Sequence, residues 1–459
     1  MSRATRSDDG DSRAPEPAGP VRRGHIGLIV AASMFGGLIL ALVLTLLVFG
    51  GATEPIISGS VLLAFALGWT MLASLSARRT DQPQTWAYVP AIFMGVLGLA
   101  HLVFRPSDGV LRAFGWVWPI AAAGLAIWLI IQSRRSLHNW SRRGIIYPVL
   151  AVLLLAAVGG GYETIRETLD ESAYAMSGQL IDVDGHKLHI SCTGSGSPTV
   201  ILEAGLGEPA AMMSGWIQPG VATATQVCVY DRAGRGWSEP AETPQDGLEI
   251  AADLHTLLSR AQVESPYVLA GHSSGGVYVQ VFAAQYPEEV AGVILLDSQP
   301  ADAFTDLPGY ASFYDGFRIA TGLAPSVARL GVMRLLYTSA AAGLPPQARA
   351  EERASWSTAR HNRSMRDEVV GLRAALTQAQ ALTSLGDKPL IVVTAVKDAE
   401  AGWLPLQEKM VSLSTNKTQR VIQDATHTSL IEEEGDAAIS IQAILDVVDA
   451  VRSGAPLLK

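Results

Sequence analysis

Five uncharged apolar runs between residues 25 and 161 constrain this chain more than any other feature of its sequence. Each run has about 17 to 25 residues, the length that an α-helix needs to cross roughly 30 Å of hydrocarbon. None of them contains Asp, Glu, Lys or Arg, a pattern that buried helices of a soluble domain rarely repeat so often. The sequence therefore predicts an all-α bundle of five transmembrane helices over 25–161, with spans at 26–50, 56–76, 87–104, 113–132 and 145–161.

Arginine is distributed unevenly among the segments that connect these runs. Eleven arginines lie in the N-terminal tail and in the loops after the second and fourth runs, against three in the segments on the other side. Short segments rich in arginine stay in the cytoplasm. The Ser/Pro/Gly-rich tail 1–24 is therefore predicted to be cytoplasmic and disordered. An odd number of spans then places everything after Gly161 outside the cytoplasm, beginning with a linker over 162–177.

Composition and charge exclude two classes of function. The net charge is −9, and no Lys/Arg-rich stripe interleaved with aromatic residues is present, so the sequence gives no sign of nucleic-acid binding. Transporters usually carry ionisable groups within their spans, and here only His101, close to the end of the third run, qualifies. We therefore expect the helices to anchor the chain in a lipid bilayer, although one helix would suffice for an anchor.

From residue 178 onward, short β-rich runs alternate with amphipathic helical stretches. This alternation is typical of an α/β domain with a mostly parallel sheet. A mostly helical stretch at about 299–386 separates the sixth and seventh runs and is predicted to be an inserted cap. The eight predicted strands are Gln179–Val183, Lys187–Cys192, Thr199–Glu203, Gln226–Tyr230, Tyr267–Ala270, Gly292–Leu296, Leu390–Thr394 and Arg420–Gln423.

The most specific motif follows the fifth predicted strand. Residues 271–275 read Gly-His-Ser-Ser-Gly, a G-x-S-x-G motif between a strand and the helical run Val277–Tyr286. Such a tight turn lifts the serine above the sheet edge, and the flanking glycines allow the strand and the helix to approach closely. The start of the helix adds backbone N–H groups that favour an oxyanion. Ser273 is therefore the predicted nucleophile.

A serine hydroxyl is a weak nucleophile, so the motif is catalytic only if a base and a carboxylate follow it. His427, just after the last predicted strand, is the predicted base, whereas His361 lies among arginines of the cap. Asp398, in the loop after the seventh strand, is the predicted acid. Asp297, at the end of the sixth strand, remains the alternative acid.

Residues 178–459 resemble the α/β-hydrolase superfamily, in the branch that includes many esterases, peptidases and perhydrolases of bacterial envelopes. Besides the serine turn and the histidine, the run Glu203-Ala204-Gly205-Leu206-Gly207 resembles the oxyanion loop of that family. The resemblance implies that the N–H groups of Leu206 and Ser274 bind the developing negative charge. Many relatives carry histidine where this chain has Ala204, so this chain departs from the family pattern within the oxyanion loop. The run 230–238 resembles a loop that is structural in the family.

The resemblance also bears on the only two cysteines, Cys192 and Cys228. In the family's sheet order the second and fourth strands are antiparallel neighbours, which implies that the two cysteines lie opposite one another. A domain outside the cytoplasm meets an oxidising environment, which favours a disulfide between them. The alternative is a pair of buried thiols packed as small apolar groups.

The resulting hypothesis is a membrane-anchored serine hydrolase that cleaves an ester or related acyl bond outside the cytoplasm. It would use a Ser-His-Asp triad, an acyl-enzyme intermediate and a small-molecule or lipid-like acyl substrate. No cofactor is implied, and no H-E-x-x-H motif or Cys/His cluster indicates a metal. The alternative hypothesis is a non-catalytic binding or sensing module of the same fold, coupled to the membrane helices.

Overall fold

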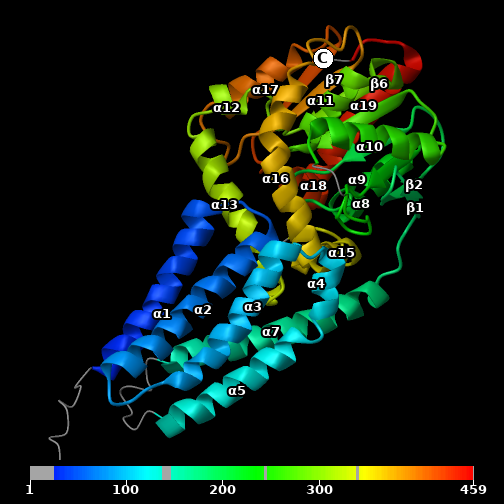
Figure 1. Ribbon diagram of the computed structural model, residues 1–459. Helices are drawn as coiled ribbons and strands as arrows, with labels where there is room; N and C mark the ends of the chain where they lie inside the picture. The colour runs from blue at the N-terminus through cyan, green and yellow to red at the C-terminus, as the bar shows by residue number, and fades with distance from the viewer. Residues whose placement is uncertain (1–24, 137–145, 242–244, 338–340, 458–459) are drawn as a thin grey trace, which may run out of the picture.

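The computed structural model describes residues 25–136, 146–241, 245–337 and 341–457. It has an elongated lobe of long helices, built from the N-terminal third of the chain, and a rounder lobe built around a β-sheet (Figure 1). The predicted cytoplasmic tail 1–24 lies outside the described residues, as do Arg142 and Arg143 of the predicted inner loop.

The first lobe contains helices of membrane-spanning length. Four helices are long and apolar enough to cross a membrane, and a fifth span results if the bent pair α4 and α5, which meet at 47°, is counted as one. The predicted region of apolar spans is therefore confirmed. Its helices are α1 Ile26–Leu42, extended by the π-helical turn Val43–Val48, α2 Glu54–Arg79, α3 Tyr88–Phe104 after a short 3₁₀ turn at Thr85–Ala87, α4 Asp108–Phe114, α5 Trp118–Ser136 and α7 Ile146–Ala173.

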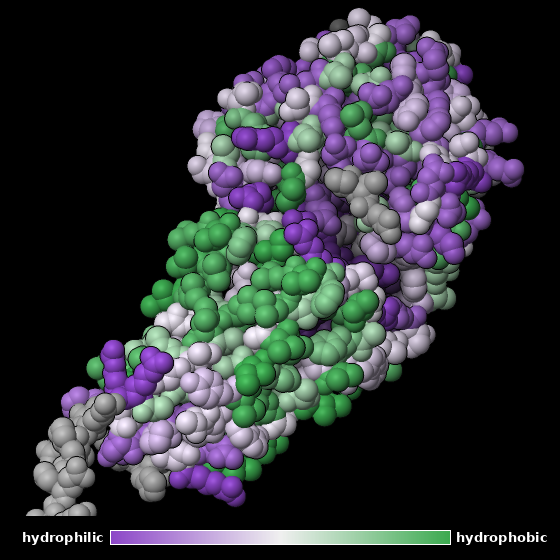
Figure 2. All heavy atoms as spheres, in the orientation of Figure 1, coloured by the Kyte–Doolittle hydropathy of each residue, from purple (hydrophilic) through white to green (hydrophobic). Residues whose placement is uncertain are grey.

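The outer surface of this lobe is apolar. Large hydrophobic side chains are exposed on every long helix, and Figure 2 shows large green areas on this lobe, with white and pale purple between them, against a mostly purple surface over the other lobe. Exposed apolar side chains on helices whose backbone groups are paired internally are suited to contact with lipid. Representative exposed residues are Leu28, Phe35, Ile92, Val96, Ile120, Val152 and Leu155.

Helix α7 extends further than the sequence predicted. It runs unbroken to Ala173, so most of the predicted linker over 162–177 is helical. The extension is stabilised because Glu163 and Asp170 on one face both pair with Arg334 of the second lobe. The opposite side of the extension exposes Tyr162, Ile165 and Leu169.

The second lobe is built on an eight-stranded sheet with the order β1-β2-β4-β3-β5-β6-β7-β8. Strand β2 is antiparallel to both of its neighbours, and strands β3 to β8 pair in parallel with one another. This mostly parallel sheet confirms the predicted fold class. The strands are β1 Gln179–Asp182, β2 Lys187–Thr193, β3 Val200–Glu203, β4 Val227–Tyr230, β5 Tyr267–His272, β6 Val290–Leu296, β7 Leu390–Ala395 and β8 Lys417–Ile422.

Helices cover both faces of the sheet and bury two apolar clusters. The cluster on one face includes residues of α10, α11, α16 and α17, and the cluster on the other includes residues of α8, α9 and α19. Burial of this much apolar surface is the main driving force for the fold. The bounds are α8 Ala210–Gly215, α9 Ile217–Ala222, α10 Gly247–Arg260, α11 Gly275–Gln285, α17 Trp403–Val411, α18 Ser429–Glu432 and α19 Glu434–Ser453, with a 3₁₀ turn at Pro287–Glu289.

The segment between β6 and β7 is helical and forms a cap. Two of its helices, α13 and α16, run from the sheet lobe toward the membrane helices in Figure 1. The Ser326 hydroxyl at the lower end of α13 lies 2.8 Å from the Ser58 hydroxyl of α2. The cap consists of α12 Ala303–Asp306, α13 Tyr310–Ala328, α14 Val332–Leu336, α15 Pro346–Ser357 and α16 Ala359–Ala379.

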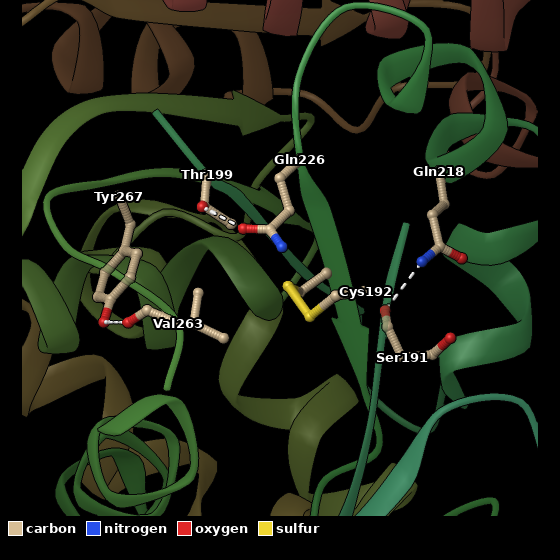
Figure 3. Close-up of a disulfide and its surroundings, with 8 residues drawn as sticks. Ser191, Cys192, Thr199, Gln218, Gln226, Val263 and Tyr267 are labelled. Atoms are coloured by element: carbon tan, nitrogen blue, oxygen red, sulfur yellow. Dashed lines mark hydrogen bonds between the residues drawn. A yellow bond between two sulfur atoms is a disulfide. The ribbon is translucent and has the colours of Figure 1, made fainter. Parts of the chain in front are cut away.

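A disulfide joins Cys192 of β2 to Cys228 of β4 (Figure 3). The antiparallel register places the two residues directly opposite one another. Cys228 is only 1% exposed, whereas Cys192, near the end of β2, is exposed. Because these are the only cysteines, the protein has no free thiol.

We expect thiol alkylation of unreduced, denatured protein from its native membrane to find no free cysteine, and two after reduction. A cross-link across 36 residues stabilises the fold by roughly 4 kcal/mol in the chain-entropy model, so the reduced protein should also unfold at a lower temperature. Two free thiols before reduction would contradict both the bond and an oxidising location for this lobe.

Candidate active site

Ser273 lies on the sharp turn between β5 and α11. Its backbone φ is +53°, a conformation uncommon for a residue with a side chain, and strain of this kind concentrates at functional sites. The turn is fixed because Ser273 donates its N–H to Leu296 O at 3.1 Å and accepts from Gln299 N at 2.9 Å. Only glycine fits at position 275, since a Cβ there would lie 2.7 Å from Ala204 O of the oxyanion loop.

His427 lies on the loop after β8 and is paired with a carboxylate at the same sheet edge. Its Nδ1 lies 2.7 Å from Asp297 Oδ2, and Asp297 follows β6 directly. The other oxygen, Asp297 Oδ1, accepts from Ala395 N at 3.1 Å and from Trp403 Nε1 at 2.8 Å. The carboxylate is 4% exposed and the imidazole 41%, so a buried, fixed carboxylate holds an imidazole that solvent can reach.

The carboxylate beside His427 is that of the alternative, Asp297, and not that of the predicted acid Asp398. Asp398 follows β7 but is exposed, in a turn with φ +66°. Among the described residues its carboxylate makes no hydrogen bond or ion pair. The turn is held by Lys397 N, which donates to Ala425 O at 3.1 Å. With the loop after β7 on this course, the carboxylate beside the imidazole is that of Asp297.

The residue before the serine, His272, forms a buried ion pair that sequence reasoning missed. His272 Nδ1 lies 3.1 Å from the Glu208 carboxylate, and Nε2 lies 3.0 Å from the backbone carbonyl of His427. Glu208 in turn accepts from Gly205 N at 2.5 Å. The pair thus connects the oxyanion loop, the serine turn and the histidine loop, and the only sequence signals for it were two ionisable residues adjacent to recognised motifs.

The opposite charges of His272 and Glu208 stabilise the pair and outweigh the unfavourable desolvation of both groups. Desolvation acts to lower the pKa of His272, but the charge and hydrogen bond of Glu208 outweigh it and raise that pKa. Desolvation likewise acts to raise the pKa of Glu208, and the His272 charge and hydrogen bond lower it. Nearby, burial and the charges of Glu432 and Glu208 raise the pKa of Glu352 to about 8, so that carboxyl is neutral at pH 7.

The oxyanion loop contains Leu206 and is held by an arginine of the loop after β4. Arg232 donates to Ala204 O at 2.7 Å and to Gly205 O at 2.6 Å, and it also pairs with Glu203. Ser274 is the N-cap of α11, and N–H groups at the start of a helix have no partner within the helix. Both predicted oxyanion donors therefore lie on elements that end beside Ser273.

The described residues contain no group of three or more His, Cys, Asp or Glu side chains that could hold a metal ion. A cavity of about 210 Å³ lies away from Ser273, between the extension of α7 and helix α15. Several of its acidic residues are already paired, Asp170 with Arg334 and Asp231 with His189.

Comparison with known proteins identifies the family of the sheet lobe. Residues 198–434 match the model of the alpha/beta hydrolase fold family. Among solved structures, the Cif epoxide hydrolase from Acinetobacter nosocomialis superimposes with a TM-score of 0.52 at 18% identity, covering 62% of this chain and 96% of that one. At this identity the likeness concerns the fold alone.

Curated relatives include uncharacterised and membrane proteins. The chain is 28% identical over 322 residues to uncharacterised protein C23C11.06c of Schizosaccharomyces pombe, covering 62% of this chain and 59% of that protein. It is 28% identical over 162 residues to uncharacterised protein YbdG of Bacillus subtilis, covering 34% and 50%. An uncharacterised vacuolar membrane protein of Saccharomyces cerevisiae matches at 22% identity over 201 residues, covering 37% and 31%. The chain thus spans less than two thirds of these relatives. Because the family model matches more than half of its residues, the chain belongs to the α/β-hydrolase family, here joined to a lobe of apolar helices long enough to cross a membrane.

Proposed function

We propose that this protein is a membrane-anchored serine hydrolase that cleaves an ester or related acyl bond outside the cytoplasm. The observation that carries the proposal is the 2.7 Å contact between His427 and the buried carboxylate of Asp297, at the sheet edge where the strained turn presents Ser273. Ser273 is the nucleophile, His427 the general base and Asp297 the acid that orients the imidazole.

The reaction proceeds in two steps. Ser273 Oγ attacks the acyl carbon while His427 Nε2 takes its proton, and the N–H groups of Ser274 and Leu206 bind the oxyanion. The bond to the leaving group then breaks, and the imidazolium returns the proton to that group. Water attacks the acyl-serine with His427 again as base, which releases the acid and restores Ser273. Asp297 accepts the Nδ1–H bond throughout and stabilises the imidazolium.

The substrate is a small-molecule or lipid-like acyl compound, and the reaction uses no cofactor. Fold alone does not distinguish an esterase from a peptidase or a perhydrolase, because these activities share the same residues. Met365 of the cap lies beside Gly207 of the predicted oxyanion loop, and this contact supports a role of the cap in shaping the acyl pocket.

The test uses the full chain in native membranes or detergent. We expect a fluorophosphonate probe to label the protein on the peptide that contains Ser273, and p-nitrophenyl esters of increasing chain length to be hydrolysed. A folded protein that is neither labelled nor active on these esters would contradict the proposal and favour the alternative, a binding or sensing module of the same fold.

The proposed location rests on arginine distribution and is supported by the disulfide, since persistent disulfides are typical of compartments outside the cytoplasm. We place the N-terminus in the cytoplasm and the hydrolase domain outside it. The lobe of apolar helices then forms a multi-pass region in the cell membrane.

A reporter enzyme that is active only outside the cytoplasm should be active when fused after Lys459 and inactive when inserted between Arg134 and Arg143. The physical reason is the excess of arginines on the predicted inner side, eleven against three. The reverse pattern would contradict the orientation, and activity at both places would contradict the number of spans.

A further inference from the structure

Four charged side chains, of which Glu54 is buried and the others are half-buried, form a cluster where the cap meets the membrane helices. We call them the junction cluster: Glu54, Asp108, Arg329 and Arg363. Glu54 and Asp108 are the first residues of α2 and α4, Arg329 follows α13, and Arg363 lies near the start of α16. Both arginines bind Glu54 through Nε, and Arg329 Nη2 lies 2.7 Å from Asp108. The cluster thus joins two helices of the cap to two helices of the membrane lobe.

Burial makes this cluster a fixed contact. The Glu54 side chain is only 1% exposed, and a carboxylate is stable out of water only when opposite charges and hydrogen bonds surround it. Two acids and two arginines balance here. Removing the charge of Glu54 would leave Arg363 with Asp108 as its remaining acidic neighbour in the cluster, at 4.0 Å.

Further arginines of the cap bind the turn between α1 and α2. Arg318 of α13 donates to Gly50 O at 2.5 Å, and Arg366 of α16 donates through Nε and Nη2 to Gly51 O at 3.1 and 3.0 Å. In Figure 1 the lower ends of α13 and α16 meet the upper ends of α1 and α2. Side chains from two helices of the cap, α13 and α16, therefore bind the cap to the membrane helices.

Helix α16 carries the membrane contacts on one face and active-site contacts on the other. Arg363 and Arg366, three residues apart, face the membrane helices, and Met365 and Glu368, also three apart, lie on the opposite side. Gly207 of the oxyanion loop has φ +74°, and a Cβ on it would lie 2.9 Å from Met365 Sδ. The oxyanion loop therefore lies directly against this part of α16.

Glu368 extends the same connection to the oxyanion loop. Its Oε1 accepts from Arg232 Nε at 2.7 Å, and Arg232 is the residue that binds the carbonyls of Ala204 and Gly205. Arg232 thus holds the backbone before Leu206, and the contact of Met365 with Gly207 holds the backbone after it. One and a half turns of a single helix thus separate the junction cluster from the groups that set the direction of the Leu206 N–H.

We propose that the membrane helices position the oxyanion loop through α16, with Glu54 as the positioning residue that acts through Arg363. The inference rests on the proposed function and deepens it. It gives the membrane lobe a role in catalysis beyond anchoring, because the cap is held in place by its contacts with that lobe.

The test compares full-length Glu54→Gln with wild type in the same detergent or vesicles. The substitution keeps the shape of the side chain and removes its charge. Because a misplacement of about 1 Å in a catalytic group can cost on the order of 10²-fold, we expect kcat for a short p-nitrophenyl ester and the rate of fluorophosphonate labelling to fall by about tenfold or more. The KM should change by less than about threefold, and binding of a trifluoromethyl ketone, which needs the oxyanion donors, should weaken in parallel with kcat.

The matched control is Glu163→Gln. Glu163 of α7 forms a comparably buried pair with Arg334 of the cap, at 2.7 and 2.8 Å, but it joins α14 and not α16. We expect this variant to stay within about twofold of wild type in kcat. The double variant Glu54→Gln/Arg363→Gln should be no slower than Glu54→Gln, since the two residues act in series.

Each outcome has a single reading when thermal unfolding and gel filtration accompany the kinetics. Near-wild-type kcat in Glu54→Gln, or equal losses in Glu54→Gln and Glu163→Gln, would overturn the inference while leaving the proposed function intact. Wild-type protein that is neither labelled nor active would refute the proposed function instead. If Glu54→Gln does not fold, Arg363→Lys takes its place, because it keeps the charge and loses the guanidinium geometry, and the same tenfold fall is expected.

Discussion

Replacing Ser273 with alanine should abolish both ester hydrolysis and covalent labelling by a fluorophosphonate. Ser273 holds the strained position between β5 and the start of α11, and the methyl group of alanine cannot attack an acyl carbon. The loss should reach the detection limit, by analogy with triads in which removing the nucleophile costs about 10⁶-fold. The thermal midpoint should stay within a few degrees, because deleting one hydroxyl creates no core cavity.

The neighbouring serine gives the matched control. Ser274→Ala should still be labelled, because Ser274 contributes its backbone N–H, which alanine retains, and its hydroxyl finds no hydrogen-bond partner among the described residues. Gel electrophoresis with a fluorescent probe measures both variants side by side. Labelling that persists in Ser273→Ala would show that the nucleophile is another residue.

Much of the fold could be predicted because its strongest patterns are local. The central strands β5, β6 and β7 are almost wholly buried, and such strands appear in the sequence as continuous apolar runs. The edge strand β8 was less clear. It begins at Lys417, three residues before the predicted start, because its exposed and half-buried polar residues give no apolar run.

The choice between two carboxylates could not be made from chain order. Asp297 and Asp398 both follow parallel strands whose ends meet at the same sheet edge. Which of them faces His427 depends on the path of the loop after β7, and that path is set by a backbone bond from Lys397 to Ala425. Hydrogen bonds between the backbones of distant loops cannot be predicted from the pattern of side chains in the sequence.

The contacts between the cap and the membrane helices could not be predicted from the sequence either. Arg329 and Arg363 meet Glu54 across 275 and 309 residues, so no periodicity or local spacing relates them. In the sequence Glu54 reads as an acidic residue at the start of a helix, a position where a carboxylate is favoured without any distant partner. Only the assembled structure shows that two cap arginines share it.

Replacing Asp297 with asparagine should lower kcat by about 10³- to 10⁴-fold while leaving the fold intact. The amide oxygen can still accept from Ala395 N and Trp403 Nε1, which preserves the local structure. The amide nitrogen would then face His427 Nδ1 and donate to it. This favours the tautomer with its proton on Nε2, which cannot accept the proton of Ser273.

The matched variant is Asp398→Asn, which should stay within about twofold of wild type because that carboxylate is exposed and makes no contact with the imidazole. Steady-state hydrolysis of a p-nitrophenyl ester measures both, with His427→Gln as the reference for complete loss of the base. The pH profile adds an independent readout. The rate that remains in Asp297→Asn should keep rising with hydroxide concentration at alkaline pH, because hydroxide must replace the missing base. An inactive Asp398→Asn beside an active Asp297→Asn would mean that the loop after β7 moves to place Asp398 at the imidazole during turnover.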